Sequence, residues 1–379
     1  MERFTSFMTN ASPNKIAVVG GGILGVSTAQ QLARAGATVV LVTDREPTSN
    51  ASGRSLSWLN SAGVRGEAYH RLRMAGIDRY RTLFAQHPDA DWLRFDGGLA
   101  WQPEDQDDQL RRHHEHERSQ GYDSHLVTRE QIANTVPGVD PAAAPPAGAI
   151  WNPGEGWVDL PSLSQVLIKD FLENGGQLVT NAGPASIEIS DGSVTRVRTE
   201  HGEVFDVDAV VLATGPAVPA MAAKLGVIIP DATPISLLVT TKPIQHRLKA
   251  VLNTPRASVR PTPDGALAVD SDWTTASIIR SDDGGYDVDQ AVIEALLAEA
   301  SKLLAGNPNL EADWHAAGPK PIPGDGEPVL GRVDEVDGLY LAFTHSGATL
   351  ALITGELLTH EVLRGPHPML ADFNVRRFR

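Results

Sequence analysis

The sequence predicts an α/β fold that begins with a Rossmann-like βαβ unit. The apolar run at residues 16–19 is typical of a short buried strand, and residues 26–35 continue as a helix. Between them, Gly20, Gly22 and Gly25 follow the G-x-G-x-x-G spacing. Strand, glycines and helix occur in the order that a dinucleotide-binding loop requires, so the motif predicts such a site here.

Each glycine of this loop has its own task. Gly20 permits a tight turn out of the strand, Gly22 leaves room for a pyrophosphate beside the backbone, and Gly25 lets the helix pack close to the sheet. The N–H groups at the start of the helix, around Ile23 and Leu24, then face the phosphates. The positive end of the helix dipole strengthens this contact.

The second strand, residues 38–42, is expected to end near the group that holds the adenosine ribose. Dinucleotide folds usually place Asp or Glu there. By register from Gly36, however, that place falls on Thr43, and Asp44 comes one residue later. Side chains alternate between faces, so either a bulge brings Asp44 to the ribose, which we favour, or the Thr43 hydroxyl binds it. Arg45 keeps NADP open as a further alternative, because a 2′-phosphate needs a basic residue.

Length and composition limit the class of protein. The chain has 379 residues, too many for one small core and typical of two interleaved domains. Its hydrophobic content of 41% and charged content of 21% are those of a globular protein. A net charge of −15 would repel nucleic acid and anionic membranes, so neither is expected as a partner. No apolar run approaches the roughly 20 residues that span a bilayer.

The chain contains no cysteine. Disulfides, cysteine-based zinc sites, a catalytic thiol and a cofactor linked through cysteine sulfur are therefore excluded. Residues 1–12 lack the apolar segment of a signal peptide, and we expect them to form a frayed start. A cytoplasmic protein is the simplest interpretation.

Periodicity and the usual start and stop residues predict the remaining elements. Helices are expected over residues 67–87, 104–120, 159–174, 287–304 and 348–363. Strands are expected over residues 93–101, 209–213 and 339–343, around the turns at 191–192 and 201–202, and within 235–278.

One charged helix carries the segment His113-His114-Glu115-His116-Glu117. His113 and Glu117 are four residues apart on one face, a spacing that suits a metal site. The whole segment is charged, however, so a solvated helix face is the preferred interpretation and no metal is expected.

Four segments, in the same order along nearly the whole chain, resemble the D-amino-acid-oxidase-like FAD-dependent oxidoreductases. This family includes glycine and sarcosine oxidases and D-amino-acid dehydrogenases. The segments are the glycine loop with residues 48–55, then 152–161, 208–215, and 318–331 with 338–350. The first segment alone indicates only a dinucleotide, whereas the fourth points to this family.

The resemblance implies FAD as the cofactor. Without cysteine in the chain, we expect it to be bound non-covalently. Ser52, Gly53, Arg54 and Ser55 are similar to the family loop that runs beside the pyrophosphate and ribitol. Gly215 is similar to the family's glycine near the cofactor.

In the fourth segment, a strand leads into the turn Thr344–Gly347, where a helix begins. The positive end of this helix suits the N1/C2=O edge of a flavin, where charge accumulates on reduction. The resemblance places the turn against that edge and makes six residues candidates: His345, Ser346, Gly347, Ala348, Thr349 and Leu350. His345 is a candidate catalytic residue, and an ordinary structural histidine is the other interpretation.

Two positions depart from the family pattern. Members that oxidise amino acids usually have an arginine that pairs with the substrate carboxylate, and Lys320 stands in its place. Lysine keeps the charge but loses the bidentate fork, so Lys320 is a candidate for holding an anionic substrate, and an α-amino acid becomes a weaker expectation. Sarcosine oxidases also place a lysine beside the flavin that helps oxygen react. Ala268 stands there by register, which favours a dehydrogenase.

The resemblance implies two interleaved domains. A Rossmann-like FAD-binding domain is expected from residues 13–92, 156–228 and 319–379. An α+β substrate-binding domain on a mixed or antiparallel sheet is expected from residues 93–155 and 229–318.

The implied reaction oxidises an amine C–N bond in a D-amino acid, an N-substituted amino acid or a related secondary amine. The amine passes a hydride to flavin N5, the imine is then hydrolysed, and oxygen or an electron carrier takes the electrons. Two alternatives stay open. One is a flavin or NAD(P) enzyme that acts on C–OH bonds or hydroxylates its substrate, and the other is a non-catalytic FAD-binding protein.

Overall fold

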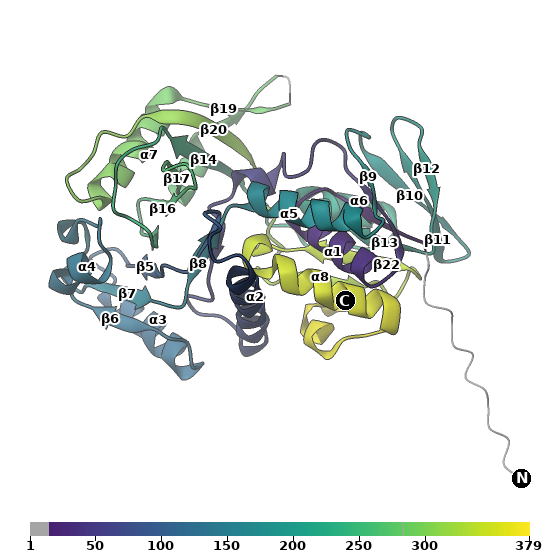
Figure 1. Ribbon diagram of the computed structural model, residues 1–379, viewed down its shortest axis with the longest axis horizontal. Helices are drawn as coiled ribbons and strands as arrows, with labels where there is room; N and C mark the ends of the chain where they lie inside the picture. Colours follow the sequence, from purple (N-terminus) through teal and green to yellow (C-terminus); the bar gives the residue numbers. More distant parts are fainter. Residues whose placement is uncertain (1–14, 283) are drawn as a thin grey trace, which may run out of the picture.

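The computed structural model describes residues 15–282 and 284–379, so the expected frayed start lies outside the described residues. Figure 1 shows two lobes side by side, with the long helix α2 (Glu67–Gln86) between them. One lobe is built on a six-stranded sheet and the other on an eight-stranded sheet.

The six-stranded sheet has the order β21-β22-β13-β1-β2-β9. All neighbours are parallel except β21, which runs antiparallel to β22. The strands are β1 (Lys15–Val19), β2 (Thr38–Val42), β9 (Gln177–Val179), β13 (Ala209–Leu212), β21 (Val329–Arg332) and β22 (Leu339–Phe343). The apolar run of β1 is buried from Ile16 to Val19, because both faces of a central parallel strand are covered.

Each face of this sheet has its own cover. Helices α1 (Ile23–Arg34), α5 (Leu160–Glu173) and α8 (Gly347–Arg364) pack together with α2 on one face. The other face is covered by α6 (Val218–Lys224) and by a small sheet of β10 (Ala185–Ser190), β11 (Ser193–Thr199) and β12 (Val204–Asp206). This three-layer arrangement is the predicted Rossmann-like α/β fold.

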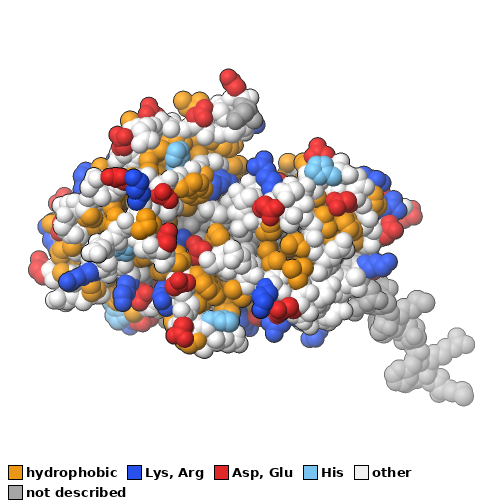
Figure 2. Space-filling view, turned by 45° about the horizontal axis from the view of Figure 1, so that its top comes forward, with side chains coloured by type: hydrophobic (Ala, Val, Ile, Leu, Met, Phe, Trp, Pro, Cys, Tyr) orange, Lys and Arg blue, Asp and Glu red, His pale blue; other side chains and the backbone are white. Residues whose placement is uncertain are grey.

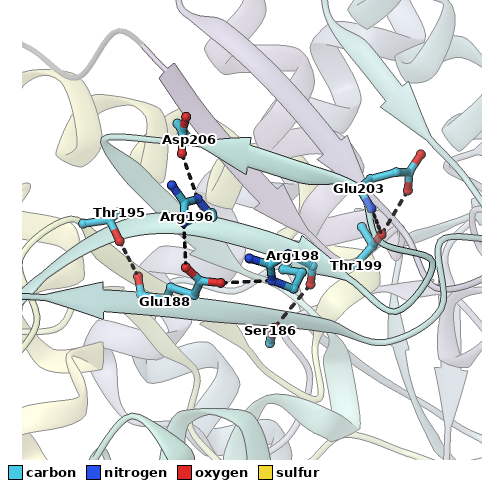
Figure 3. Close-up of polar contacts among 8 residues, drawn as sticks. All are labelled: Ser186, Glu188, Thr195, Arg196, Arg198, Thr199, Glu203 and Asp206. Carbon is cyan, nitrogen blue, oxygen red and sulfur yellow. Dashed lines mark hydrogen bonds and ion pairs between the residues drawn. The ribbon is translucent and has the colours of Figure 1, made fainter.

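Figure 3 shows the polar contacts across this small sheet. Glu188 accepts from Arg196 and Arg198 at 3.1 Å each, and Asp206 accepts from Arg196 at 2.8 Å. These side chains are partly exposed to solvent, and ion pairs at the surface contribute little stability. The network joins three strands and lies apart from the site described below.

The eight-stranded sheet has the order β20-β14-β17-β16-β15-β5-β7-β6. Two separate segments supply it, and they meet where β15 runs parallel to β5, with Val251 opposite Gly98. All its other neighbours are antiparallel, so the sheet is mixed, as predicted. Its strands are β5 (Gly98–Ala100), β6 (His125–Val127), β7 (Ala149–Asn152), β14 (Ile235–Thr241), β15 (Val251–Asn253), β16 (Ser258–Pro261), β17 (Leu267–Asp270) and β20 (Ala312–Pro319).

Helices α3 (Asp107–Ser119), α4 (Arg129–Thr135) and α7 (Gln290–Leu303) belong to the lobe of the eight-stranded sheet. Two small sheets complete the structure. One contains β3 (Trp58–Leu59), β8 (Gly156–Val158) and β4 (Leu93–Arg94), and the other β18 (Ile278–Arg280) and β19 (Tyr286–Val288). The exact domain boundaries given above stay a prediction.

Three predicted elements were wrong in extent. The helix expected from residue 104 begins three residues later, at Asp107. The expected strand over residues 93–101 is divided between two sheets, because the chain turns at Gly97 with φ 84°. A Cβ at Gly97 would also lie 1.9 Å from the Trp151 ring. The helix expected from residue 287 begins three residues later, after β19, with Asp289 as its N-cap.

No helix of the described residues is long and apolar enough to cross a membrane. Figure 2 shows acidic and basic side chains interspersed on one face of the molecule.

Candidate active site

A cavity of about 790 Å³ lies where the parallel strands β1, β2, β13 and β22 end. It extends to residues of the eight-stranded sheet, including Ser258 and Asp270. We call it the main cavity. It lies at the carboxyl ends of the strands, beside the switch point between β1 and β13, which is where ligands bind in open α/β sheets.

Contacts within the protein require a glycine at two of the three loop positions, Gly20 and Gly25. Gly20 has φ 117°, and a Cβ there would lie 2.4 Å from the Ala213 carbonyl oxygen. A Cβ at Gly25 would lie 1.9 Å from the Gly20 carbonyl oxygen. At Gly22, by contrast, a Cβ would meet nothing closer than the Ser52 hydroxyl at 3.4 Å. The protein itself leaves room at Gly22, which is the position where a ligand would approach the backbone.

The start of α1 is partly occupied by a neighbouring loop. The Ile23 N–H donates to the Ser52 hydroxyl at 3.0 Å. The sequence predicted that this N–H is free to face a phosphate, whereas it already has a partner. Ser52 belongs to the 3₁₀ helix η1 (Ala51–Arg54), which lies over the glycine loop. Ser52 therefore links the two segments that the sequence assigns to the pyrophosphate.

The structure separates the two candidates for the adenosine ribose. Thr43 is buried, and its hydroxyl donates to the Arg45 carbonyl at 2.9 Å. Asp44 is exposed at the cavity, beside Glu46. The register of β2 with β1 and β9 is regular to Val42, so Asp44 reaches the cavity without a bulge in the paired strand.

The start of α8 also lines the main cavity. No side chain caps this helix. Ser346 lies 2.5 Å from the Tyr69 hydroxyl and accepts a further hydrogen bond from Arg73. Arg73 is buried on α2 and also donates to the carbonyl and side-chain oxygens of Asn60, each at 2.8 Å. A fixed guanidinium and an uncapped helix N-terminus thus give this wall a positive potential.

His345 is exposed into the cavity. Burial under the surrounding atoms, together with the nearby cations Lys320, Arg73 and Arg65, lowers the pKa of its imidazole to about 3. The ring is therefore neutral at physiological pH. A neutral imidazole offers one hydrogen-bond donor and one acceptor.

Lys320 lies at the other wall, just after β20. Its ammonium is 3.5 Å from the Asp272 carboxylate, whose side chain is 97% exposed. Its backbone N–H donates to the Pro234 carbonyl at 2.9 Å, which fixes the position of the segment. Burial raises the pKa of nearby Asp270, and Lys320 opposes that rise.

Most of the predicted site residues line one cavity. They are Gly20, Gly22, Ile23, Leu24, Thr43, Asp44, Ser52, Arg54, Ser55, Gly215, Lys320, His345, Ser346, Gly347, Ala348 and Thr349. Gly25, Arg45, Gly53 and Leu350 do not line it. Gly25 packs against Gly20, and Leu350 is fully buried in the core.

Four further residues line the same cavity and were not predicted from the sequence: Trp58, Asn60, Arg65 and Arg73. They come from residues 58–73, which follow the recognised loop and contain no family motif. The helical pattern of α2 gave only the apolar face, and nothing in it marks Arg73 as the arginine that points inward.

A second cavity of about 300 Å³ lies on the other side of residues 52–57. Ala268 and Arg260 both line it and are direct partners across strands β17 and β16. Arg260 is buried, with the Asp159 carboxylate 3.7 Å away. A positive charge is therefore present beside Ala268, although that residue supplies none.

The histidine-rich segment is not a fully solvated face. Glu117 is buried, accepting from the Gly63 N–H and the Ser124 hydroxyl at 2.6 Å each. His116 and Gln120 contact the backbone of Arg65. This helix face therefore holds the loop that precedes α2, and the expectation of a solvated face was wrong for Glu117.

Comparison with known proteins identifies the family. The family described as FAD dependent oxidoreductase matches residues 15–361. This chain belongs to the FAD-dependent oxidoreductase family. The predicted family and the predicted FAD-dependent redox function are thereby confirmed.

Relatives match this FAD-dependent oxidoreductase along nearly its whole length. A glycine oxidase from Geobacillus kaustophilus is 26% identical over 381 residues, covering 96% of each chain. A D-amino acid dehydrogenase from Cereibacter sphaeroides is 26% identical over 431 residues, covering 96% of this chain and 95% of its own. The solved structure of an L-amino acid deaminase from Proteus myxofaciens has a TM-score of 0.83 and 18% identity, covering 100% and 96% of the two chains. That likeness confirms the predicted fold.

The residues of the main cavity fit FAD. Gly22 leaves room beside the backbone at the start of α1, and Gly347 leaves room at the start of α8, where a Cβ would meet nothing closer than 3.9 Å. Asp44 offers a carboxylate at the end of β2, the place that dinucleotide folds use for the ribose. These groups occur along one continuous cavity.

Proposed function

We propose that this protein uses non-covalently bound FAD to oxidise the C–N bond of a small amine that carries an anionic group. One observation supports this most strongly: the main cavity extends from the glycine loop to a part, here called the chamber, that is lined by positive side chains beside His345. These side chains are Arg54, Arg65, Arg73 and Lys320. When bound, FAD accepts a hydride from the amine carbon. The resulting imine takes up water and splits into a carbonyl compound and either ammonia, from a primary amine, or a shorter amine, from a secondary amine.

In this proposal, the protein's own residues bind the cofactor and orient the substrate. Gly22 and Ser52 hold the pyrophosphate, Asp44 holds the ribose, and the start of α8 with Arg73 stabilises negative charge on the reduced ring. Lys320 holds the anionic group of the substrate. This assignment brings together residues from both lobes.

The positive potential of the chamber also favours the neutral form of the amine. The cations that lower the pKa of His345 would likewise disfavour a bound ammonium, because like charges repel. The amine must be neutral to release a hydride, so this potential favours the reactive form. His345, with a pKa of about 3, is too weak a base to take the amine proton and acts as a hydrogen-bond partner.

The electron acceptor and the cytoplasmic location are part of the proposal. Ala268 carries no charge, and we retain a dehydrogenase over an oxidase, although Arg260 lies directly across from it. Comparing hydrogen peroxide release with the reduction of an artificial dye would decide between the two acceptors.

Anaerobic titration of the holoenzyme tests the function. Amines should bleach the flavin absorbance near 450 nm, and NADPH should not. A panel of D-amino acids, N-substituted amino acids and 2-hydroxy acids covers the alternatives. Bleaching by a hydroxy acid alone would favour C–OH oxidation, and a flavin that no compound reduces would favour a non-catalytic binding protein.

A further inference from the structure

The substrate end of the main cavity carries cations from two separate parts of the chain. Arg54 and Lys320 form one group, here called the β20 pair, and Arg65 and Arg73 form another, called the α2 pair. All four residues line the main cavity. His345 lies within electrostatic range of both pairs, since Lys320, Arg73 and Arg65 each lower the pKa of its ring.

The β20 pair is packed against one strand. The Arg54 guanidinium lies so close to Gly318 that a Cβ there would overlap it. Gly318 precedes Lys320 by two residues. Burial lowers the pKa of Arg54, while the Tyr286 phenol has a smaller opposite effect. The only carboxylate within 4.0 Å of Lys320 among the described residues belongs to the almost fully exposed Asp272.

In the α2 pair, the two arginines differ in the hydrogen bonds that they form. Both guanidinium groups lie over the Tyr69 ring, at 5.5 Å for Arg65 and 5.4 Å for Arg73. Arg73 is committed to Asn60 and Ser346, as described above. Arg65 forms no ion pair within the described residues, and its Nε is buried without a hydrogen-bond partner. Arg65 is therefore the member with capacity for a ligand.

The backbone of Arg65 is held in a fixed position. Gln120 Nε2 donates to the Arg65 carbonyl at 2.7 Å, and His116 Nε2 lies 2.9 Å from the same oxygen. Two residues earlier, Gly63 donates to the buried Glu117 at 2.6 Å. His116, Glu117 and Gln120, from α3 and its C-terminal end, thus fix the backbone at Arg65. Among the described residues, no carboxylate lies within 4.0 Å of its half-buried guanidinium. Residues that bind a ligand are commonly held in place by such a second layer of supporting contacts.

We propose that the substrate is a secondary amine with a carboxylate on each side of the nitrogen, one held by Lys320 with Arg54 and the other by Arg65. This inference rests on the proposed function and names its substrate class. A monocarboxylate would satisfy only one group and leave the other partly buried cation without a partner. An unpaired buried charge is costly, so the second carboxylate should add affinity.

Binding to the holoenzyme tests this without turnover. Thiodiacetate replaces the amine by sulfur and keeps both carboxylates, whereas (methylthio)acetate keeps one. Both are titrated against the flavin absorbance spectrum, and thiodiacetate should bind about tenfold more tightly, or better. In Arg65→Met, the stem remains but the charge is lost, and this preference should fall to near unity. Lys320→Met should weaken both ligands.

Arg71→Met is the matched control. Arg71 lies on α2 and is exposed, and it pairs with Glu67 one turn away, so its loss should leave both affinities unchanged. Equal affinity of the two sulfur compounds for the unmutated holoenzyme would overturn the proposal, as would an unchanged preference in Arg65→Met.

Flavin reduction separates this inference from the proposed function. If N-methyl amino acids with one carboxylate bleach the flavin as fast as dicarboxylate secondary amines, the dicarboxylate inference fails and amine oxidation stands. If no amine bleaches the flavin, the proposed function fails, whatever the sulfur compounds do.

Discussion

At the residue scale, Gly22 differs from its neighbours in the loop because nothing within the protein requires it. Its φ is −72°, which any residue can adopt, and a Cβ has room. Gly20 and Gly25 are instead held by contacts with backbone atoms. The absence of a side chain at Gly22 therefore serves a ligand.

We expect Gly22→Val to fold and to lose FAD. The branched side chain would enter the space beside the backbone that the pyrophosphate needs. Circular dichroism should show an intact fold, while the ratio of absorbance at 450 nm to that at 280 nm should fall to that of the apoprotein. A folded variant with its full content of FAD would show that the pyrophosphate binds elsewhere.

Asp44 and Thr43 give a second prediction at this scale. The Thr43 hydroxyl is already bound to the Arg45 carbonyl, whereas the Asp44 carboxylate faces the cavity. Asp44→Ala should therefore raise the Kd for FAD about tenfold, as expected for the loss of a charge-assisted hydrogen bond, and Thr43→Ala should raise it less. Fluorescence titration of the apoproteins measures both constants. The reverse order would assign the ribose to Thr43.

At the element scale, the sequence predicted the elements that carry strong local signals. The bounds of β2 and β22 agree with the predicted strands, and α5 begins after Asp159, whose carboxylate accepts from the Ser162 N–H as an N-cap should. These elements have an uninterrupted apolar run or a capping residue. The strand over residues 93–101 was mispredicted because only tertiary contacts reveal that Gly97 makes room for Trp151.

The arginines of the site escaped prediction for a similar reason. Arg65 and Arg73 lie among other arginines on and before α2. The sequence does not show which of these arginines are buried and which are exposed. The decisive contacts come from α3 and α8, far away in the sequence. The glycine loop could be predicted because all its constraints lie within one βαβ unit.

The turn between β7 and β8 places Glu155 where it joins several elements. Its buried carboxylate accepts from Trp58 Nε1 at 2.7 Å, from the Tyr122 hydroxyl at 2.6 Å and from the Asn152 side chain at 3.3 Å. Burial raises the pKa of this carboxyl to about 8, from an ordinary value of 4.5. The folded protein therefore keeps a proton that the unfolded chain loses at lower pH.

This difference predicts a pH-dependent contribution to stability. Between about pH 4.5 and pH 8 the folded state binds one more proton at Glu155, so the free energy of unfolding falls as the pH rises, by up to about 1.4 kcal/mol per pH unit. Glu155→Gln has no such proton. Relative to the unmutated protein, it should gain stability as the pH rises through this window.

Urea unfolding at several pH values measures the effect. A constant offset between the two proteins is expected from altered hydrogen bonds, and only the slope reports the proton. Glu104→Gln, at an exposed carboxylate in the same lobe, is the control and should run parallel to the unmutated protein. Parallel curves for Glu155→Gln as well would contradict the prediction.

At the scale of the whole molecule, the main cavity is shared by the two lobes. Its lining combines the strand ends of the six-stranded sheet with residues of β14, β16 and β17 from the eight-stranded sheet. Figure 1 shows these sheets in different lobes. A cofactor in this cavity therefore contacts segments that lie far apart along the chain, and its binding energy adds to the stability of the folded state.

FAD should consequently be removable and stabilising. Because the chain has no cysteine, acid precipitation should release all the yellow colour into the supernatant. The apoprotein prepared under mild conditions should unfold at a lower Tm, and added FAD should restore it, since free FAD at 100 times its Kd contributes about 2.7 kcal/mol. In Gly22→Val, added FAD should leave the Tm unchanged.

Colour retained in the acid pellet would indicate a covalent link through a residue other than cysteine. An apoprotein with the Tm of the holoenzyme would mean that FAD does not stabilise the fold through this cavity.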